Sequence, residues 1–213
     1  DIDAMMDPVP PVEMVPSDLE RAIDNAIIGN PALGNTSVTV EVARERKRTI
    51  RAELFPSIDV ETRWNFEKNA GAVLGVRRDY SFFLRATWNL FTGFSTRNLM
   101  SQANFDLSAS KDNHDFTTRK VIEQTRLAWQ ALLTARQRLE LFENAVNIAS
   151  ELFASRQKLR EAGKETVINV LDAENEVNNA QINFTSASYD ERLAVYQLLL
   201  AMGFLNPAGL NLY

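Results

Sequence analysis

The sequence predicts an α+β protein in which two amphipathic β-strands interrupt a series of long antiparallel coiled-coil helices. Three observations support this fold class. Apolar residues alternate with a period of two between Pro56 and Gly93, and neither proline nor glycine occurs from Thr96 to Glu161. Alanine then recurs every seven residues from Ala173 to Ala201, which is the spacing of a coiled-coil seam.

The composition excludes several classes of protein. The chain has 213 residues, 45% of them hydrophobic, and a net charge of -5, whereas a nucleic-acid partner requires a basic surface. It has no cysteine and a single histidine, so we expect no catalytic, cofactor-binding or metal-binding residues. No run approaches the roughly 18 consecutive apolar residues of a membrane-spanning helix.

The first part of the chain predicts a connector and two helices. Residues 1–17 carry four of the seven prolines, which favour an extended backbone. Ser17 or Asp18 is a candidate N-cap for a short helix over 19–28, which residues 29–31 (Gly-Asn-Pro) end. A second helix is expected over 36–54, because the sequence there favours helix until Pro56.

Two alternating segments then predict a β-hairpin. Apolar residues alternate with polar or charged ones without a break from Ile58 to Glu67, and again from Tyr80 to Leu90 with Phe83 as the only exception. Residues 71–79 join the two segments. Each segment has the length of a tilted transmembrane strand, about 10 residues. The same pattern suits a soluble domain in which a helix covers the apolar face, so the alternation alone leaves both possibilities open.

The remaining residues predict a long helical hairpin. The segment from Thr96 to Glu161 can form one helix of roughly 100 Å. Gly163 offers a left-handed C-cap, and Thr166 can cap a returning helix that extends to about Met202. Apolar or small residues at spacings of three and four form a candidate seam on the first helix: Thr125, Ala128, Leu132, Ala135, Leu139, Phe142, Val146, Ala149 and Phe153.

The returning helix has two apolar stripes. The heptad alanines alternate with Val170, Val177, Phe184, Glu191 and Leu198 in one seam. A second stripe of Ile182, Tyr189 and Tyr196 points away from that seam. Apolar flanks with polar faces between them suit the wall of a water-filled tube, although a soluble antiparallel coiled coil shows a similar pattern.

The strands and the helices together suggest a membrane pore that continues as a helical tube. Two strands cannot close a barrel, and an open sheet edge in lipid leaves backbone groups unsatisfied, so we expect oligomerisation. Two alternatives remain. One is a soluble coiled-coil scaffold or adaptor with a small β domain. The other is a hydrolase, which would require Asp59, Glu61 and Glu67 to face a closed pocket.

Five motifs carry a resemblance to a known family. They are LERAIDNAIIGNP (19–31), LFP (54–56), WNLFTG (88–93), AGKETVINVLDAEN (162–175) and LLLAMG (198–203). In this order and spacing the segment from Asp18 to Gly203 resembles the second of the two internal repeats of the TolC family of outer-membrane channel proteins. The resemblance implies that this chain is the C-terminal half of a longer protein.

The resemblance implies the following organisation. A homotrimer of two-repeat protomers forms a transmembrane β-barrel in the bacterial outer membrane, and an α-helical barrel extends from it into the periplasm. Within this chain, residues 1–17 are the connector, 18–56 periplasmic helices, 57–93 two transmembrane strands with an extracellular loop, 94–203 a periplasmic helical hairpin with its tip near 162–166, and 204–213 a C-terminal tail.

The implied function is a passive exit duct with no enzymatic activity. The implied partners are a periplasmic adaptor (membrane fusion protein), which docks at the tip, and an inner-membrane ABC transporter or proton-driven pump that acts through the adaptor. Residues 172–176 and the ending from Tyr196 to Gly203 look more like members that serve type I protein secretion than like drug-efflux members. Multidrug efflux is the alternative within the family.

The resemblance also assigns roles to individual residues. The periplasmic constriction matches Asn169 and Asp172, although family members often place two acidic residues there. The tip turn and adaptor-docking positions are Arg160, Gly163, Lys164, Glu165 and Thr166, of which Arg160 and Glu165 are candidates to form ion pairs at the tip. Residues expected in the barrel lumen are Asp59, Glu61, Arg63, Arg85 and Asn89. Residues expected to face lipid are Ile58, Val60, Trp64, Phe66, Tyr80, Phe82 and Trp88.

Overall fold

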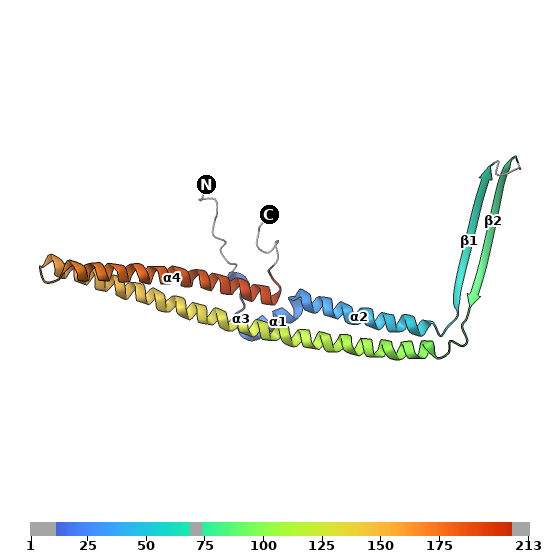
Figure 1. Cartoon of the computed structure of the whole chain (residues 1–213), viewed down its shortest axis with the longest axis horizontal. Coiled ribbons are helices and arrows are strands. Elements are labelled where there is room, and N and C mark those ends of the chain that lie inside the picture. The colour runs from blue at the N-terminus through green and yellow to red at the C-terminus, as the bar shows by residue number, and fades with distance from the viewer. Residues whose placement is uncertain (1–11, 69–73, 206–213) are drawn as a thin grey trace. The chain divides into compact units, whose positions relative to one another are not determined.

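A computed structural model describes residues 12–68 and 74–205 (Figure 1). The chain divides into two compact units, residues 1–35 with 115–213 and residues 36–114, which are described separately. Most of the expected connector, the turn of the hairpin and the end of the tail lie outside the described residues. The elements are the 3-10 helix η2 (Val12–Met14), helices α1 (Leu19–Gly29) and α2 (Pro31–Ala52), strands β1 (Ser57–Lys68) and β2 (Val76–Thr87), and helices α3 (Ser95–Glu161) and α4 (Val167–Met202).

Helix α1 begins as the sequence predicts, but the expected start of α2 at residue 36 is wrong. The Asp18 side chain accepts a hydrogen bond of 2.8 Å from the Arg21 amide and caps α1. The Asn30 side chain accepts a bond of 2.9 Å from the Ala32 amide in the same way, and Pro31 occupies the first helical position. Residues 29–31 therefore end one helix and begin the next.

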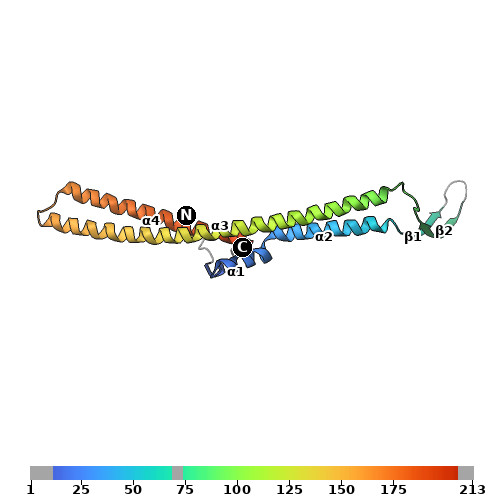
Figure 2. The same ribbon diagram turned by 90° about the horizontal axis from the view of Figure 1, so that it is seen from below.

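The core of the first unit lies where α1 packs on the C-terminal part of α4 and where α3 and α4 pair. Ala22 and Ala26 of α1 and Leu198 of α4 are completely buried, and Leu132 of α3 is 1% exposed. The seam residues expected on α3 and the heptad stripe of α4 are all buried or half-buried. The coiled-coil seam predicted from the sequence is therefore confirmed. Figure 2 shows α3 and α4 running as an antiparallel pair.

The C-terminal end of α4 requires glycine. Gly203 has a φ of 80°, and the Phe204 amide donates to the Leu199 carbonyl at 2.9 Å, which closes the last turn. A Cβ atom at Gly203 would lie 2.7 Å from the Gly29 carbonyl oxygen. The Asn30 amide group adds a bond of 2.9 Å to the Ala201 carbonyl. Backbone contact between α4 and the junction of α1 and α2 thus leaves no room for a side chain at residue 203.

The hairpin of the second unit pairs β1 and β2 antiparallel, from Ser57 opposite Thr87 to Lys68 opposite Val76. The expected second strand, 80–90, is displaced: β2 begins four residues earlier and ends at Thr87. Pairing explains the shift, because residues 76–79 have hydrogen-bonding partners in the last four residues of β1. Trp88 and Asn89 consequently lie beyond the strand, where the Trp88 indole donates to the Leu54 carbonyl at 3.1 Å.

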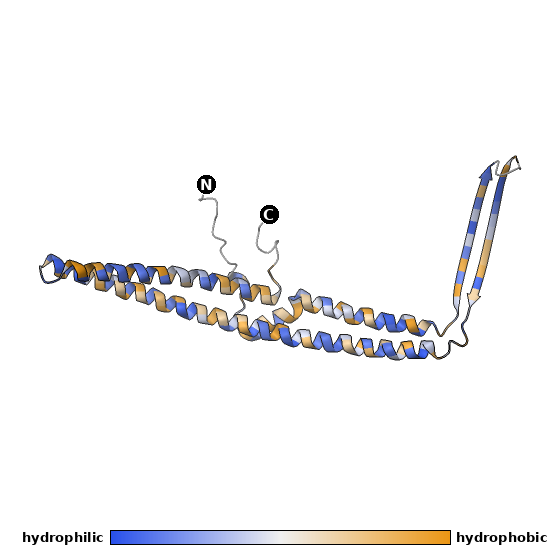
Figure 3. Ribbon diagram, viewed as in Figure 1, coloured by the Kyte–Doolittle hydropathy of each residue, from blue (hydrophilic) through white to orange (hydrophobic). Residues whose placement is uncertain are grey.

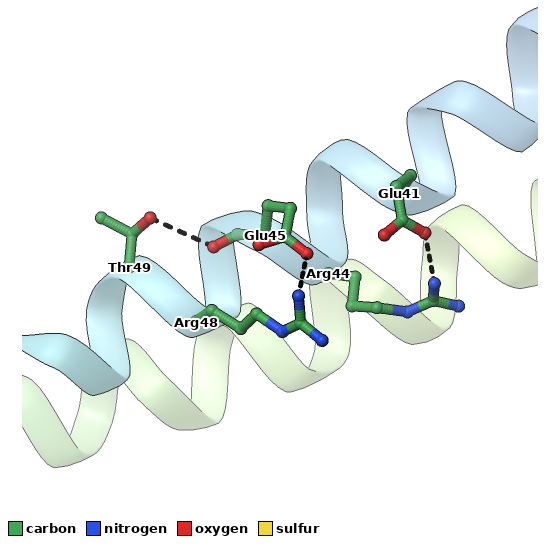
Figure 4. A network of polar contacts seen from close by, with 5 residues as sticks. All are labelled: Glu41, Arg44, Glu45, Arg48 and Thr49. Atoms are coloured by element: carbon green, nitrogen blue, oxygen red, sulfur yellow. Dashed lines mark hydrogen bonds and ion pairs between the residues drawn. The ribbon is translucent and has the colours of Figure 1, made fainter.

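Helix α2 carries two charged pairs on its surface. Within α2, Arg44 pairs with Glu41, Arg48 pairs with Glu45, and the Thr49 hydroxyl donates to the Glu45 carbonyl at 3.1 Å (Figure 4). These ion pairs are half-exposed, so each contributes at most about 1 kcal/mol. None of the helices in the described residues combines the length and the apolar character needed to cross a membrane.

Candidate functional site

The register of the hairpin separates its residues into two faces of opposite character. Cross-strand partners share parity, because Ile58 lies opposite Ala86 and Asp59 opposite Arg85. All even-numbered residues of β1 and β2 therefore lie on one face and all odd-numbered residues on the other. Both faces are largely exposed along the full length of the two strands. In Figure 3 the hydrophobic colour gathers in the half of the hairpin nearest the helices.

The odd-numbered face is polar and carries paired charges. Arg63 forms an ion pair of 2.8 Å with Glu61, and Arg77 one of 2.9 Å with Asp79. Asp59, Glu61, Arg63 and Arg85, which were expected in a barrel lumen, all lie on this face, whereas Asn89 lies beyond β2. Asp59, Glu61 and Glu67 are exposed on an open sheet face. The hydrolase alternative would require them to face a closed pocket.

The even-numbered face is apolar over most of its length. It carries six of the seven residues expected to face lipid: Ile58, Val60, Trp64, Phe66, Tyr80 and Phe82. The seventh, Trp88, lies past the end of β2. Trp64 and Tyr80 stack across the strands with ring centroids 5.7 Å apart. Phe82 is 69% exposed and Val60 is 60% exposed, so this face has no covering element among the described residues.

The turn between α3 and α4 is the second candidate site, and its backbone geometry follows from Gly163. This residue has a φ of 72°. The Lys164 amide donates to the Leu159 carbonyl and the Gly163 amide to the Arg160 carbonyl, both at 2.9 Å. This is the Schellman motif, as expected for a glycine that follows the last helical turn. Thr166 then caps α4 by accepting from the Asn169 amide at 3.4 Å.

Hydrogen bonds of Glu165, Asn169 and Arg156 join the two helix ends. The Glu165 carboxylate accepts from the Asn169 side chain and from the Thr166 amide, the latter at 3.0 Å. Arg156 of α3 donates to the Asn169 carbonyl at 3.2 Å. The bonds from Asn169 and Thr166, together with the nearby Arg156 charge, hold the pKa of the Glu165 carboxyl below its usual value.

Neither Arg160 nor Glu165, the candidate ion-pair formers of the tip, forms an ion pair within the described part of the chain. Glu165 folds back over the first turn of α4, where Asn169 supplies a donor, so its bonding partners lie on α4 instead. Sequence reasoning missed Arg156. No local signal marks this residue, because only the pairing of α3 with α4 brings it to the Asn169 carbonyl.

The two residues assigned to the constriction have different surroundings. Asn169 is half-buried in the tip network, whereas Asp172 lines a groove of about 410 Å³ between α3 and α4. The other polar residues of this groove are Asn175, Glu176, Asn179 and Asn183, and its apolar floor includes Phe142, Ala145 and Ala149. Within the described residues, no group of three or more metal-ligating side chains is placed to hold an ion.

Comparison with known proteins decides the family. The sequence model of the family described as outer membrane efflux protein matches residues 22–204. The chain belongs to the outer membrane efflux protein family. The long paired helices interrupted by an amphipathic hairpin are thus part of an outer membrane efflux protein, and the fold class predicted from the sequence is confirmed.

Two curated relatives and one solved structure illustrate the similarity. The chain is 26% identical over 192 residues to outer membrane protein TolC of Vibrio cholerae, which covers 88% of this chain and 44% of that protein. It is 25% identical over 192 residues to the alkaline protease secretion protein AprF of Pseudomonas aeruginosa. This match covers 89% of this chain and 40% of that protein. The chain therefore spans less than half the length of the curated relatives that it matches.

The solved structure of the Campylobacter jejuni CmeC outer membrane channel superposes with a TM-score of 0.78 at 15% sequence identity, and covers 92% of this chain and 42% of that chain. At this identity the likeness shows the fold alone. It supports the arrangement of helices and strands described above.

Proposed function

We propose that this chain is the C-terminal repeat of a trimeric outer-membrane exit duct, which conducts substrate passively from a periplasmic adaptor to the cell exterior. The observation that carries the proposal is the hairpin. Its even-numbered face is apolar and exposed, its odd-numbered face is charged and exposed, and each strand spans 12 residues. A wall with lipid on one side and water on the other has this pattern.

The free edges of the hairpin support oligomerisation. In the described residues β1 and β2 pair only with each other, so each strand has one edge with unpaired backbone groups. Such an edge is costly in lipid, and neighbouring repeats would complete the pairing. Six repeats in a trimer would supply a closed barrel of twelve strands. Ile58, Val60, Trp64, Phe66, Tyr80 and Phe82 then face lipid, and Asp59, Glu61, Arg63 and Arg85 face the lumen.

The second apolar stripe of α4, which contains Ile182, Tyr189 and Tyr196, supports a tubular arrangement of the helices. Ile182 is 66% exposed and Tyr189 is 52% exposed, although they lie on a helix whose opposite side forms the buried seam. A helix of a neighbouring repeat would cover this stripe. Each helix would then have neighbours on two sides, as the wall of a periplasmic duct requires.

The turn between α3 and α4 is the proposed periplasmic tip. Gly163 and Lys164 are exposed at the turn and are available to an adaptor, while the bonds of Thr166 and Glu165 fix the start of α4. Three copies of Asp172 around an axis would give the entrance a negative potential. Asn169 contributes no charge, so the ring at the level of residue 172 would dominate cation preference.

Type I protein secretion is the proposed process. The sequence of residues 172–176 and the similarity to a protein whose name describes alkaline protease secretion both favour it. Drug efflux is the second candidate, because the matching family is described by efflux. Deletion of the full-length gene separates the two: loss of a secreted protein from the culture medium supports secretion, whereas increased drug susceptibility with unchanged secretion supports efflux.

Planar-bilayer conductance of the detergent-extracted full-length protein tests the duct itself. We expect discrete channels whose preference for cations weakens in Asp172→Ala. Glu174→Ala is the matched control, because Glu174 is an exposed carboxylate two residues away that does not line the groove. If neither substitution changes the cation preference of the channels, Asp172 does not form the constriction. A full-length protein that forms no channels and needs no detergent would support the scaffold alternative.

A further inference from the structure

Two basic residues lie on the apolar face of the hairpin, near its end away from the helices. Lys68 and Arg78 are even-numbered; Lys68 pairs with Val76 in the last even-numbered pair, and Arg78 pairs with Phe66 in the pair before it. Every carboxylate of β1 and β2 lies on the opposite, odd-numbered face, where Glu67 and Asp79 occupy the same level. On the face that carries Lys68 and Arg78, therefore, the two strands supply no carboxylate.

The contrast with the opposite face is informative. There Arg63 and Arg77 each form an ion pair shorter than 3 Å with a carboxylate two residues away. Among the described residues Arg78 forms no such pair, and its guanidinium lies over the Phe66 ring at 5.8 Å from the centroid. Adjacent arginines in one strand thus have different partners, and only the partner of Arg77 is anionic.

The even-numbered face also changes character in layers. Nearest the helices it carries aliphatic residues such as Ile58 and Val60, followed by the stacked pair of Trp64 and Tyr80. The last two pairs each combine one basic and one apolar residue, Arg78 with Phe66 and Lys68 with Val76. Aromatic residues concentrate at the boundary between hydrocarbon and headgroups, and basic side chains extend into the headgroup layer. Aromatic residues followed by basic residues are the order expected where a transmembrane strand leaves the hydrocarbon on the outer side.

We infer that Lys68 and Arg78 bind phosphate groups of lipids in the outer leaflet of the outer membrane. The inference rests on the proposed function, since it requires the even-numbered face to meet lipid. An arginine held over an aromatic ring presents its N–H donors in a plane that fits a phosphate, and Lys68 adds a second charge on the same face. Phosphate supplies the anion that this face lacks.

Lipid binding to the full-length trimer in detergent tests the inference. The probes are bisphosphorylated lipid A and the same lipid with its phosphates removed, titrated and detected by native mass spectrometry. We expect the wild-type protein to prefer the phosphorylated lipid, and Lys68→Gln/Arg78→Gln to weaken its binding about thirtyfold, since each cation near a charged lipid surface adds about 1 kcal/mol. Binding of the dephosphorylated lipid should not change.

The matched control is Arg63→Gln/Arg77→Gln, which removes the same charge from the opposite face and should leave lipid affinity within about twofold of wild type. Arg78→Lys keeps the charge and should retain most of the affinity, which guards against misfolding of the double variant. Equal weakening by both double variants would overturn the site in favour of general charge attraction. Competition by millimolar inorganic phosphate would overturn the assignment to a lipid.

The proposed function can fail separately. Conductance is recorded on the same preparations. Channels without any preference for the phosphorylated lipid would overturn only this inference, whereas a protein without channels or bound lipid would overturn both. If a carboxylate of a neighbouring strand pairs with Arg78 in the trimer, the preference for the phosphorylated lipid should be absent. That result would also count against the inference.

Discussion

The helical hairpin of α3 and α4 and the β-hairpin bury their apolar residues in different ways. Along the helices, each seam residue meets a partner from the same chain: Leu198 is completely buried and Ala187 is 2% exposed. Along the strands, Phe82 and Tyr80 remain 69% and 71% exposed. The helices bury their main apolar seam within the chain. The apolar face of the strands stays exposed in the described residues and needs lipid or a neighbouring repeat to cover it.

This difference predicts which substitutions act on folding and which act on assembly. A change in the seam removes contacts that exist in the isolated repeat, so it lowers the free energy of unfolding directly. A change on an exposed strand face alters no contact within the chain and acts only through lipid or a neighbouring repeat. In the full-length protein we expect the core substitution to have the greatest effect and the tip substitution the least.

Leu198→Ala should have the largest effect. It removes a completely buried side chain from the core where α1 meets α4, which costs about 4 kcal/mol of unfolding free energy. Denaturant unfolding followed by circular dichroism measures this loss. The control Gln197→Ala changes the exposed neighbouring residue and should shift the unfolding free energy by less than about 0.5 kcal/mol. Similar losses in both variants would contradict the assignment of the core.

Val60→Arg should prevent accumulation in the outer membrane without disturbing the helices. An arginine facing lipid near the middle of the membrane costs about 3 kcal/mol. Phe83→Arg is the matched control, because Phe83 is an apolar residue on the polar face, opposite Glu61 and one pair from Val60. The measurement is the amount of each variant in the outer-membrane fraction. Equal loss of both variants would show that the faces do not differ in their surroundings.

Gly203→Ala and Gly163→Ala compare two glycines that share a left-handed backbone. Alanine at residue 163 meets open space, so only the backbone penalty of about 1 kcal/mol applies. Alanine at residue 203 adds a clash with the Gly29 carbonyl, which raises the cost to about 2–3 kcal/mol. Thermal unfolding of both variants gives the difference. A Gly203→Ala protein as stable as Gly163→Ala would rule out the close backbone contact.

Glu165 should make the tip sensitive to acid, which is the smallest effect. Its pKa is lowered in the folded protein, so its contribution is complete above the ordinary carboxyl value of 4.5 and is lost as the pH falls through the folded value. Hydrogen exchange at the Thr166 and Asn169 amides, measured between pH 3 and pH 6, should therefore show protection relative to intrinsic exchange that decreases at low pH in wild type. In Glu165→Gln the pH dependence beyond that of intrinsic exchange should disappear; an unchanged profile would contradict the network.

The sequence predicted regular features well where one physical signal was sufficient. The heptad alanines specified the seam of α4 because coiled-coil packing repeats every seven residues, and Gly163 specified the turn because a left-handed residue there is costly for other side chains. The alternation from Ile58 to Glu67 specified two chemically different faces. The start of α2 was missed although Asn30 followed by Pro31 carries the signal of a capped helix.

Other features depended on contacts between distant residues. The beginning of β2 at Val76 followed from pairing with β1, because residues 76–79 do not alternate by themselves. The bond from Arg156 to the Asn169 carbonyl required α3 and α4 to pair first. The necessity of glycine at residue 203 came from the approach of the Gly29 backbone, which lies 174 positions earlier in the sequence.

The sequence by itself therefore determined the types of the elements, the seam and the two faces of the hairpin, since periodicity and local backbone preferences act over a few residues. The strand register, the partners of Glu165 and the placement of Lys68 and Arg78 on the face without carboxylates depended on the tertiary structure. These features depend on which residues meet across the pairing of two strands or two helices, and local sequence does not encode those distances.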